Sequence, residues 1–296
     1  MVDARAFKTP ILLIIFNRPE TTKTVFESIR SVRPAAYFVA ADGPRAQLEG
    51  EAAKCDQARR IATAVDWDCD LHTLWRDRNL GAGPGVASAI TWFFDHVSKG
   101  IILEDDCVPS SSFYRFCEEL LTYYGPTPSV MHISGNNFQY GRKRGEGSYY
   151  FSAYTHSWGW ATWRRAWMHY DFELISAALR SHVWDGQWHL SVERNNGMAV
   201  LPNVNLVKNI GFGADATHTR TMERYAMLPA QEIAFPLLHP RTMAIDRAAD
   251  TLTYYANFRN IKSLDLVPLH YAWDYVAYRV RKLLKIVLRR LRAKER

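Results

Sequence analysis

Three consecutive carboxylates, Glu104, Asp105 and Asp106, directly follow a short apolar run at residues 101–103. The run reads as a buried strand. Adjacent carboxylates at the end of a strand repel one another, so a cation or a hydrogen-bonding ligand must compensate their charge. Oxygen ligands favour Mg²⁺ or Mn²⁺, which proteins commonly hold through one or two carboxylates, water and substrate phosphate. We therefore predict a divalent-metal site; the alternative is a solvated acidic turn before a helix that starts near Ser110.

The carboxylates follow the last of four strand-like runs that alternate with helical segments. The four runs cover residues 10–16, 37–41, 70–75 and 101–103. In the first helical segment Val25, Ile29 and Val32 fall on one face. This alternation predicts an α/β fold with an open, mainly parallel twisted sheet flanked by helices.

Each of these runs ends in a polar turn. Asn17, Asp42 and Asn79 stand in the first three turns, and the acidic cluster stands in the fourth. Asn and Asp are ordinary turn residues when taken singly. Ligands of open α/β sheets, however, bind outside the carboxyl ends of the strands, so all four turns are predicted to line one rim.

The second half of the chain has a less regular pattern. A predicted strand at residues 130–134 precedes a charged loop at 139–147 and an aromatic-rich block at 154–163. Flat aromatic faces suit both sugar rings and hydrophobic packing. We expect most of these rings in the core, while Gly159 between two tryptophans suggests that one edge stays open to a ligand.

In the order of its polar turns, the chain resembles nucleotide-diphospho-sugar glycosyltransferases of the GT-A fold. The motifs that carry the resemblance are Asn17-Arg18-Pro19, Asp42-Gly43, Arg78-Asn79-Leu80-Gly81 and Glu104-Asp105-Asp106. They are most similar to the group with a Glu-Asp-Asp metal motif, the N-acetylglucosaminyltransferase-like enzymes. The block at residues 157–163 also resembles bacterial glycosyltransferases, and the resemblance covers roughly residues 8–240.

The resemblance implies a role for each matched residue. Asp106 is expected to coordinate the metal, with Glu104 and Asp105 nearer the donor sugar and its ribose. The residues expected to contact the nucleotide are Asn17, Arg18, Asp42, Arg78 and Asn79.

The candidate catalytic base is Asp185. It stands in Trp184-Asp-Gly-Gln-Trp188, which resembles the element that supplies the base in that group. A base opposite the leaving diphosphate implies direct displacement with inversion at the anomeric carbon. The alternative is that Asp185 caps a helix starting at Gln187. Further along, His218 could serve as a metal ligand or phosphate contact, and a loop histidine without such a role is the equal alternative.

The implied function is a metal-dependent glycosyltransferase. Its donor would be a nucleotide sugar, with a UDP-sugar favoured, its ion Mn²⁺ or Mg²⁺, and its acceptor a glycan or lipid-linked molecule such as a cell-envelope polysaccharide precursor. One alternative is a phosphohydrolase of the haloacid-dehalogenase type, which needs Asp where Glu104 stands. A sugar nucleotidylyltransferase would need a Gly-rich phosphate loop after the first strand, where Phe16-Asn-Arg-Pro stands. A non-catalytic carbohydrate-binding or membrane-associated protein with this fold is the alternative from another class.

The positive charge of the chain is confined to its last residues. Nine Lys and Arg and one Glu lie in residues 279–296, a net +8, so the remainder carries 7 − 8 = −1. This distribution argues against nucleic-acid binding. We predict a glycosyltransferase domain at 1–240, with a nucleotide-binding half at 1–125 and an acceptor half at 126–240, and a C-terminal extension at 241–296.

Residues 275–296 of this extension combine apolar residues at helical spacing with a basic face. This pattern is typical of an amphipathic helix on an anionic membrane surface; the alternative is a helix that packs on this chain or on a second copy. No signal peptide or spanning helix is apparent, and the cysteines show neither zinc-ligand spacing nor a disulfide framework. The expected location is the cytoplasm, with peripheral attachment to the inner face of the membrane, and the oligomeric state is left open.

Overall fold

The computed structural model describes residues 7–174, 183–212 and 227–258. Contacts divide the chain into two compact units, Met1–Ile245 and Asp246–Arg296. The domain boundary predicted at 240/241, and the division of the first domain at 125/126, stay predictions. His218 and the predicted basic helix at 275–296 lie outside the described residues.

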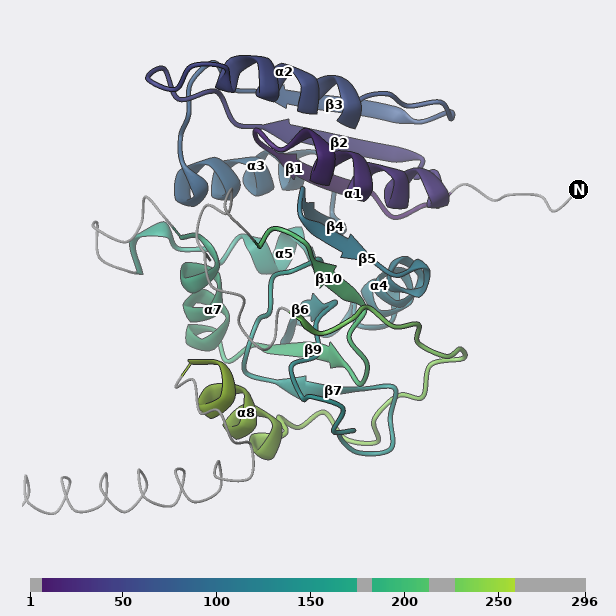
Figure 1. Cartoon of the computed structure of the whole chain (residues 1–296). Helices are drawn as coiled ribbons and strands as arrows, with labels where there is room; N and C mark the ends of the chain where they lie inside the picture. The colour runs from purple at the N-terminus through teal and green to yellow at the C-terminus, as the bar shows by residue number, and fades with distance from the viewer. Residues whose placement is uncertain (1–6, 175–182, 213–226, 259–296) are drawn as a thin grey trace, which may run out of the picture. The chain divides into compact units, whose positions relative to one another are not determined.

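An eight-stranded sheet forms the centre of the first unit (Figure 1). Its strands, in spatial order, are β3 (Asp70–Trp75), β2 (Ala36–Ala41), β1 (Ile11–Ile15), β4 (Lys99–Glu104), β8 (Trp160–Trp163), β6 (Val130–Ser134), β9 (Met198–Pro202) and β7 (Tyr149–Ser152). The first four run parallel, whereas β8 is antiparallel to both of its neighbours and β7 is antiparallel to β9. Since β6 and β9 are again parallel, the predicted α/β class with a mainly parallel sheet is confirmed.

Burial explains why the central strands read as uninterrupted apolar runs. Every residue of β1 is buried, as are residues 100–103 of β4. Strands covered by helices on both faces need apolar side chains at successive positions rather than at alternate ones. The edge strand β3 instead leaves Leu71 and Trp75 each 38% exposed. The strands β1 and β4, which end at the polar rim, are therefore buried more completely than the edge strand β3.

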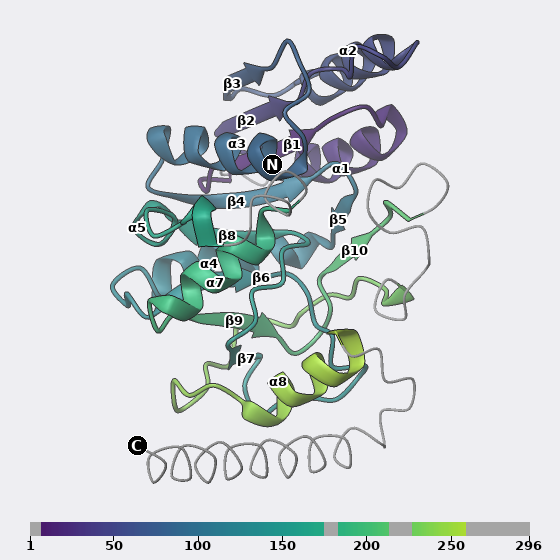
Figure 2. The same cartoon turned by 90° about the vertical axis from the view of Figure 1, so that its left-hand side faces the viewer.

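Helices cover both faces of the sheet. One face packs against α1 (Pro19–Val32), α2 (Glu51–Ala62) and α4 (Ser111–Tyr123). The other packs against α3 (Ala82–His96), α5 (Arg164–Trp167) and α7 (Asp185–Arg194), and Figure 2 shows α3 and α7 in front of the strands. A short 3₁₀ helix, η1, covers Phe172–Leu174. The sheet thus separates two hydrophobic clusters.

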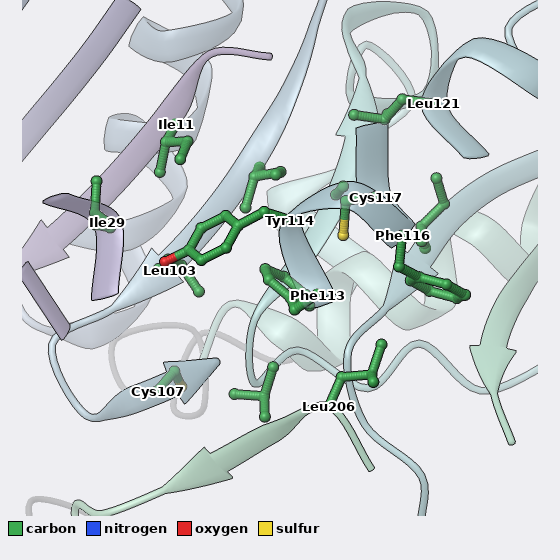
Figure 3. Packing of buried hydrophobic residues seen from close by; sticks show 14 of the residues in the cluster. Ile11, Ile29, Leu103, Cys107, Phe113, Tyr114, Phe116, Cys117, Leu121 and Leu206 are labelled. Carbon is green, nitrogen blue, oxygen red and sulfur yellow. The ribbon is translucent and has the colours of Figure 1, made fainter. Parts of the chain in front are cut away.

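Helix α4 anchors the first of these clusters. Figure 3 shows Phe113, Tyr114, Phe116 and Cys117 on this helix, with the Tyr114 ring extending toward Ile29. The Tyr114 hydroxyl lies 2.9 Å from Ser28 Oγ, so its polar end is satisfied where the ring is buried. This contact joins α4 to α1, the helix that begins directly after the first polar turn.

A second, two-stranded sheet follows the acidic cluster. It pairs β5 (Cys107–Pro109) antiparallel with β10 (Val207–Asn209). Strand β5 starts one residue after Asp106, so this small sheet fixes the main chain on the far side of the cluster.

The described part of the second unit is helical. Helix α8 (Arg247–Thr253) begins after Asp246, whose side chain accepts a hydrogen bond from Ala249 N at 2.9 Å, and is followed by the π-helical segment η3 (Tyr254–Phe258). Among the described residues, no helix has both the length and the apolar character that crossing a bilayer requires.

Candidate active site

A cavity of about 480 Å³ opens at the carboxyl ends of β1, β2, β3 and β4. The starts of α3 and α7 and the end of β10 complete its wall. The predicted site residues that line it are Arg18, Asp42, Asn79, Glu104, Asp105, Asp106 and Asp185. Asn17 and Arg78 are not among the lining residues, and His218 lies outside the described residues. The fold therefore brings most of the predicted polar turns, and Asp185 from the second half, to one cavity.

The first two acidic residues lie close to one another; Asp105 is buried and Glu104 is partly exposed. Asp105 is 8% exposed and accepts a hydrogen bond from Phe16 N at 3.2 Å. Burial, and then the charge of Asp106, raise the pKa of Asp105 to about 7. Burial also raises the pKa of Glu104 well above its ordinary value, with Asp106, Asp105 and Asp185 as further causes. In the described part of the chain no donor is hydrogen-bonded to the Glu104 side chain, so a bound cation or hydrogen-bonding ligand would favour its ionised form.

Asp106 is held by neighbours from three elements. Arg18 Nη1 donates to Asp106 Oδ2 at 2.8 Å, from the turn between β1 and α1. Asn209 Nδ2, at the end of β10, lies 3.5 Å from the other carboxylate oxygen, and Ile210 N donates to the Asp106 carbonyl at 2.8 Å. Gly211 packs so closely that an added Cβ would collide with Oδ2. This carboxylate is fixed where the β5–β10 sheet meets the rim.

Asp42 links two turns of the rim. Its carboxylate accepts hydrogen bonds from the backbone N–H groups of Gly43 and Leu80 at 2.9 Å and of Gly81 at 3.1 Å, and from Asn79 Nδ2 at 2.9 Å. Burial raises the pKa of Asp42, while these backbone donors act in the opposite direction. Asp42 and Asn79 thus shape the cavity wall through bonds to one another.

Asn17 has a supporting position beside the cavity. Its side-chain amide donates to Glu51 Oε1 at 2.8 Å. Glu51 also forms an ion pair with Arg45. The hydrogen bond that the Arg45 side chain donates to Glu51 is the main cause of the lowered pKa of Glu51. The Arg45 guanidinium lies 5.4 Å from the centre of the Phe16 ring, and both Arg45 and Phe16 line the cavity. The contacts among Asn17, Glu51 and Arg45 therefore hold the positively charged Arg45 side chain at the rim.

Small residues form the end of the cavity between β1–β3 and α3. Ala40, Ala82, Gly85 and Ala89 line it there. Arg76, the first residue after β3, donates through Nη2 to Ser88 Oγ at 3.2 Å, and among the described residues its Nε and Nη1 have no hydrogen-bond acceptor. This end of the cavity, called the slot below, is therefore lined by small apolar residues together with the Arg76 guanidinium. Sequence analysis missed Arg76; its place directly after a predicted strand was the available signal.

Asp185 brings a carboxylate from the second half of the chain to the same cavity. It is exposed, is the first residue of α7, and accepts a hydrogen bond from Gly186 N at 2.9 Å. The helix already begins at Asp185, with Trp184 before it, so the alternative of a cap for a helix starting at Gln187 is wrong. An exposed carboxylate beside a cavity can accept a proton from a bound hydroxyl group.

The aromatic block divides between core and cavity. Trp160 is fully buried and stacks on Trp184 with ring centres 5.5 Å apart, whereas Trp158 lines the cavity. Gly159 between them has φ +65°, and a Cβ there would lie 2.8 Å from Val207 Cγ2. Glycine is needed at this position for both conformation and space, and the turn directs Trp158 toward the site.

A buried histidine of β6 is hydrogen-bonded to a side chain of α7. His132 Nδ1 accepts a hydrogen bond from Trp188 Nε1 at 3.1 Å, and its Nε2 donates to the His156 carbonyl at 2.9 Å. Burial lowers the pKa of His132 to about 3, so the ring is neutral near neutral pH. His132 thereby joins β6 to the helix that carries Asp185.

The acidic end of the cavity is formed by Glu104, Asp105 and Asp106. Their carboxylate oxygens suit a divalent ion of the Mg²⁺ or Mn²⁺ type, and the Glu104 carboxylate accepts no hydrogen bond from the described residues. Within residues 7–174, 183–212 and 227–258, no group of three or more His, Cys, Asp or Glu side chains is arranged around one point as a metal cage. The residues present therefore fit an ion held by one or two carboxylates and completed by water and phosphate.

Comparison with known proteins gives little further information. No protein-family model and no curated protein matches the chain. Among solved structures, it is similar to the apo form of mouse xyloside xylosyltransferase 1, with a TM-score of 0.38 and 11% sequence identity, over 64% of this chain and 83% of that chain. A similarity of this size carries no argument about activity.

Proposed function

We propose that this protein is a metal-dependent glycosyltransferase that moves a sugar from a nucleotide diphosphate, with UDP-sugars favoured, to a glycan or lipid-linked acceptor. One observation carries the proposal: an acidic cluster, a separate exposed carboxylate and a slot with apolar walls line a single cavity. Glycosyl transfer needs these three elements, because the leaving diphosphate, the acceptor hydroxyl and the nucleoside must be bound together.

The slot is suited to the nucleoside. Its small side chains leave room for a flat base, and the Arg76 guanidinium can donate to a base carbonyl. Three strand spacings separate β3, which precedes Arg76, from β4, which ends at Glu104. At about 4.8 Å each they span roughly 14 Å, which is enough for the diphosphate of a nucleotide bound in the slot to reach the acidic cluster.

Asp106 would hold the divalent ion, with Glu104 and Asp105 nearer the donor sugar and its ribose. Bound there, the ion would supply Lewis-acid stabilisation of the charge that grows on the leaving diphosphate. Arg18 and Arg45 add positive charge at the same rim. These basic side chains favour an anionic ligand at this end of the cavity.

Asp185 would act as the general base. Its carboxylate would accept the proton of the acceptor hydroxyl as this oxygen attacks the anomeric carbon, and the bond from that carbon to the diphosphate oxygen would break. Attack from the face opposite the leaving group gives inversion. Trp158, which also lines the cavity, offers an aromatic face against which an acceptor sugar can pack.

The first test is thermal unfolding of the protein with UDP, GDP, CDP, ADP and their sugars, in Mn²⁺ and in EDTA. A ligand at 100 times its Kd adds about 2.7 kcal/mol to the stability of the native state. We expect a melting-temperature increase that requires both metal and one class of nucleotide. The corresponding nucleotide sugar should then release nucleoside diphosphate when an acceptor is supplied. Release of inorganic phosphate from the nucleoside diphosphate itself would indicate a phosphohydrolase, and binding of sugars without nucleotide would indicate a non-catalytic protein.

A further inference from the structure

The cavity wall at Trp158 is held by buried polar side chains at the end of β6 and in the turn after it. Ser134 Oγ donates to the His156 carbonyl at 2.9 Å. Asn136 Oδ1 accepts a hydrogen bond from Trp158 N at 3.0 Å. Ser134 and Asn136 are both fully buried. The core at this end of β6 therefore sets where the main chain of this wall lies.

His132 forms a further bond to this segment and a bond to α7 as well. Its Nε2 donates to the His156 carbonyl at 2.9 Å, and its Nδ1 accepts a hydrogen bond from Trp188 Nε1 at 3.1 Å. Helix α7 begins at Asp185, and Trp188 follows three residues later, about one turn along the helix. One imidazole ring therefore connects the helix that carries Asp185 to the main chain that carries Trp158.

The orientation of the His132 ring is fixed. The residue is fully buried, and its ring stacks on the Trp160 indole with ring centres 4.9 Å apart. Burial lowers the pKa of His132 to about 3, so the neutral ring keeps a lone pair on Nδ1 for the Trp188 N–H. Moving the ring would leave this buried N–H without an acceptor, which costs free energy. The connection between the two walls is therefore rigid near neutral pH.

We propose that His132 is a positioning residue that sets the distance between the Asp185 carboxylate and the Trp158 ring. Under the proposed function the carboxylate accepts the proton of the acceptor hydroxyl, and the ring packs against the acceptor sugar. These two groups must keep their spacing, since a displacement of about 1 Å can cost about 100-fold in rate. The inference rests on the proposed function, because it assumes that Asp185 and Trp158 serve the same acceptor.

The donor end of the cavity does not depend on this connection. Asp106 is held by Arg18 and by the end of β10, and Asp42 is held by the turn after β3. None of these contacts involves β6 or α7. Loss of the His132 bonds should therefore slow transfer without weakening the binding of metal and nucleotide.

The test compares two variants of His132. His132→Phe keeps a flat ring but removes both hydrogen bonds, whereas His132→Gln keeps an acceptor and a donor. The donors are UDP-glucose, UDP-galactose and UDP-N-acetylglucosamine, with the methyl glycosides of these sugars as acceptors. The measured rate is that of UDP release at a temperature where every variant is folded. We expect kcat of His132→Phe to fall about 10-fold to 100-fold at an unchanged donor KM, and that of His132→Gln to fall less.

Further measurements separate positioning from a general loss of stability. The melting-temperature increase with UDP and Mn²⁺ should be the same in His132→Phe as in the wild type, because the donor end is unchanged. Thr162→Val is the matched control. It removes the buried hydrogen bond of 2.6 Å from Thr162 Oγ1 to the Met131 carbonyl, on the strand beside β6, and should keep the wild-type kcat. Crystal structures should show the distance between Asp185 and Trp158 changed in His132→Phe and unchanged in Thr162→Val.

Two results would overturn the inference: a wild-type kcat in folded His132→Phe, or an unchanged distance between Asp185 and Trp158 in its crystal structure. UDP release by the wild type would in that case leave the proposed function standing. If the wild type released no UDP from any donor, the proposed function would lose its support, and the crystal structures would still decide whether His132 positions Asp185.

Discussion

The Asn79 side chain donates a hydrogen bond of 2.9 Å to Asp42, although the two residues are 37 positions apart in the chain. The turn after β2 and the turn after β3 therefore hold one another in place, and together they form one wall of the cavity. The backbone bonds from Leu80 and Gly81 to the same carboxylate reinforce this link.

Replacing Asp42 with Asn is expected to destabilise the protein. The amide group would face N–H donors with an NH₂ group of its own, leaving buried donors without an acceptor, at a cost of about 1–3 kcal/mol. Urea unfolding measures the difference. Asp77→Asn, at an exposed position of the neighbouring turn, is the matched control and should change stability little. Equal stability of both variants would show that the turn-to-turn bonds are not needed.

Replacing Asp185 with Asn should abolish transfer and leave donor binding intact. Loss of a general base reduces the rate by about 10² to 10⁴-fold, while the acidic cluster and the slot are unchanged. The measurements are the turnover rate and the melting-temperature shift with nucleotide and Mn²⁺. Glu193→Gln, exposed on the same helix, should keep full activity. An Asp185→Asn enzyme as active as the wild type would exclude Asp185 as the base.

Replacing Asp106 with Ala should remove the dependence of nucleotide binding on metal. The variant loses the carboxylate assigned to the ion and the partner of Arg18. The melting-temperature increase expected with UDP and Mn²⁺ should then shrink to the value obtained in EDTA. Asp95→Ala, at an exposed position of α3, serves as the control. A full metal-dependent shift in Asp106→Ala would move the ion to another residue.

Stability should fall in acid through His132. The pKa of this buried ring is lowered to about 3, so the unfolded chain binds more protons than the folded protein between that value and about pH 6.5. The free energy of unfolding contributed by His132 is fully present above about pH 6.5. It decreases as pH falls from there toward pH 3, by up to about 1.4 kcal/mol per pH unit.

The variant His132→Phe isolates this contribution. Its stability near neutral pH should be lower, because Trp188 Nε1 loses its acceptor, but its decline between pH 6.5 and pH 4 should be shallower. His156, also buried with a pKa lowered to about 3, keeps part of the slope in both proteins. Urea unfolding at several pH values measures the two curves. Parallel curves would contradict the prediction.

The sequence predicted the first half of the fold well. The run at residues 70–75 is β3, and the apolar runs at 10–16 and 101–103 contain β1 and the centre of β4. The strands β1 and β4 are buried on both faces, so their uninterrupted apolar runs are distinct from the sequences of the helices. The strands β7 and β8 were not predicted, because each has only four residues and lies in aromatic-rich sequence that packs equally well in loops.

The candidate site was predicted as a set of residues but not as a set of contacts. The rule that ligands lie at the carboxyl ends of strands placed Asp42 and Asp106 at one rim. It did not distinguish Asp42, which four donors of the chain itself surround, from Glu104, which the described residues leave without a donor. The Arg18–Asp106 pair joins residues 88 positions apart, and its geometry depends on where β1, β4 and β10 end.

The pairing of β5 with β10 has a consequence for how the protein is made. Asp106 is fixed by residues at the end of β10, and the contact with Asn209 spans 103 positions. The slot end, between β1–β3 and α3, uses residues no later than Ala89. The contacts that fix Asp106 at the acidic end can form only after β10 has been synthesised. During synthesis the chain therefore contains every residue of the slot end before it contains the strand that fixes Asp106.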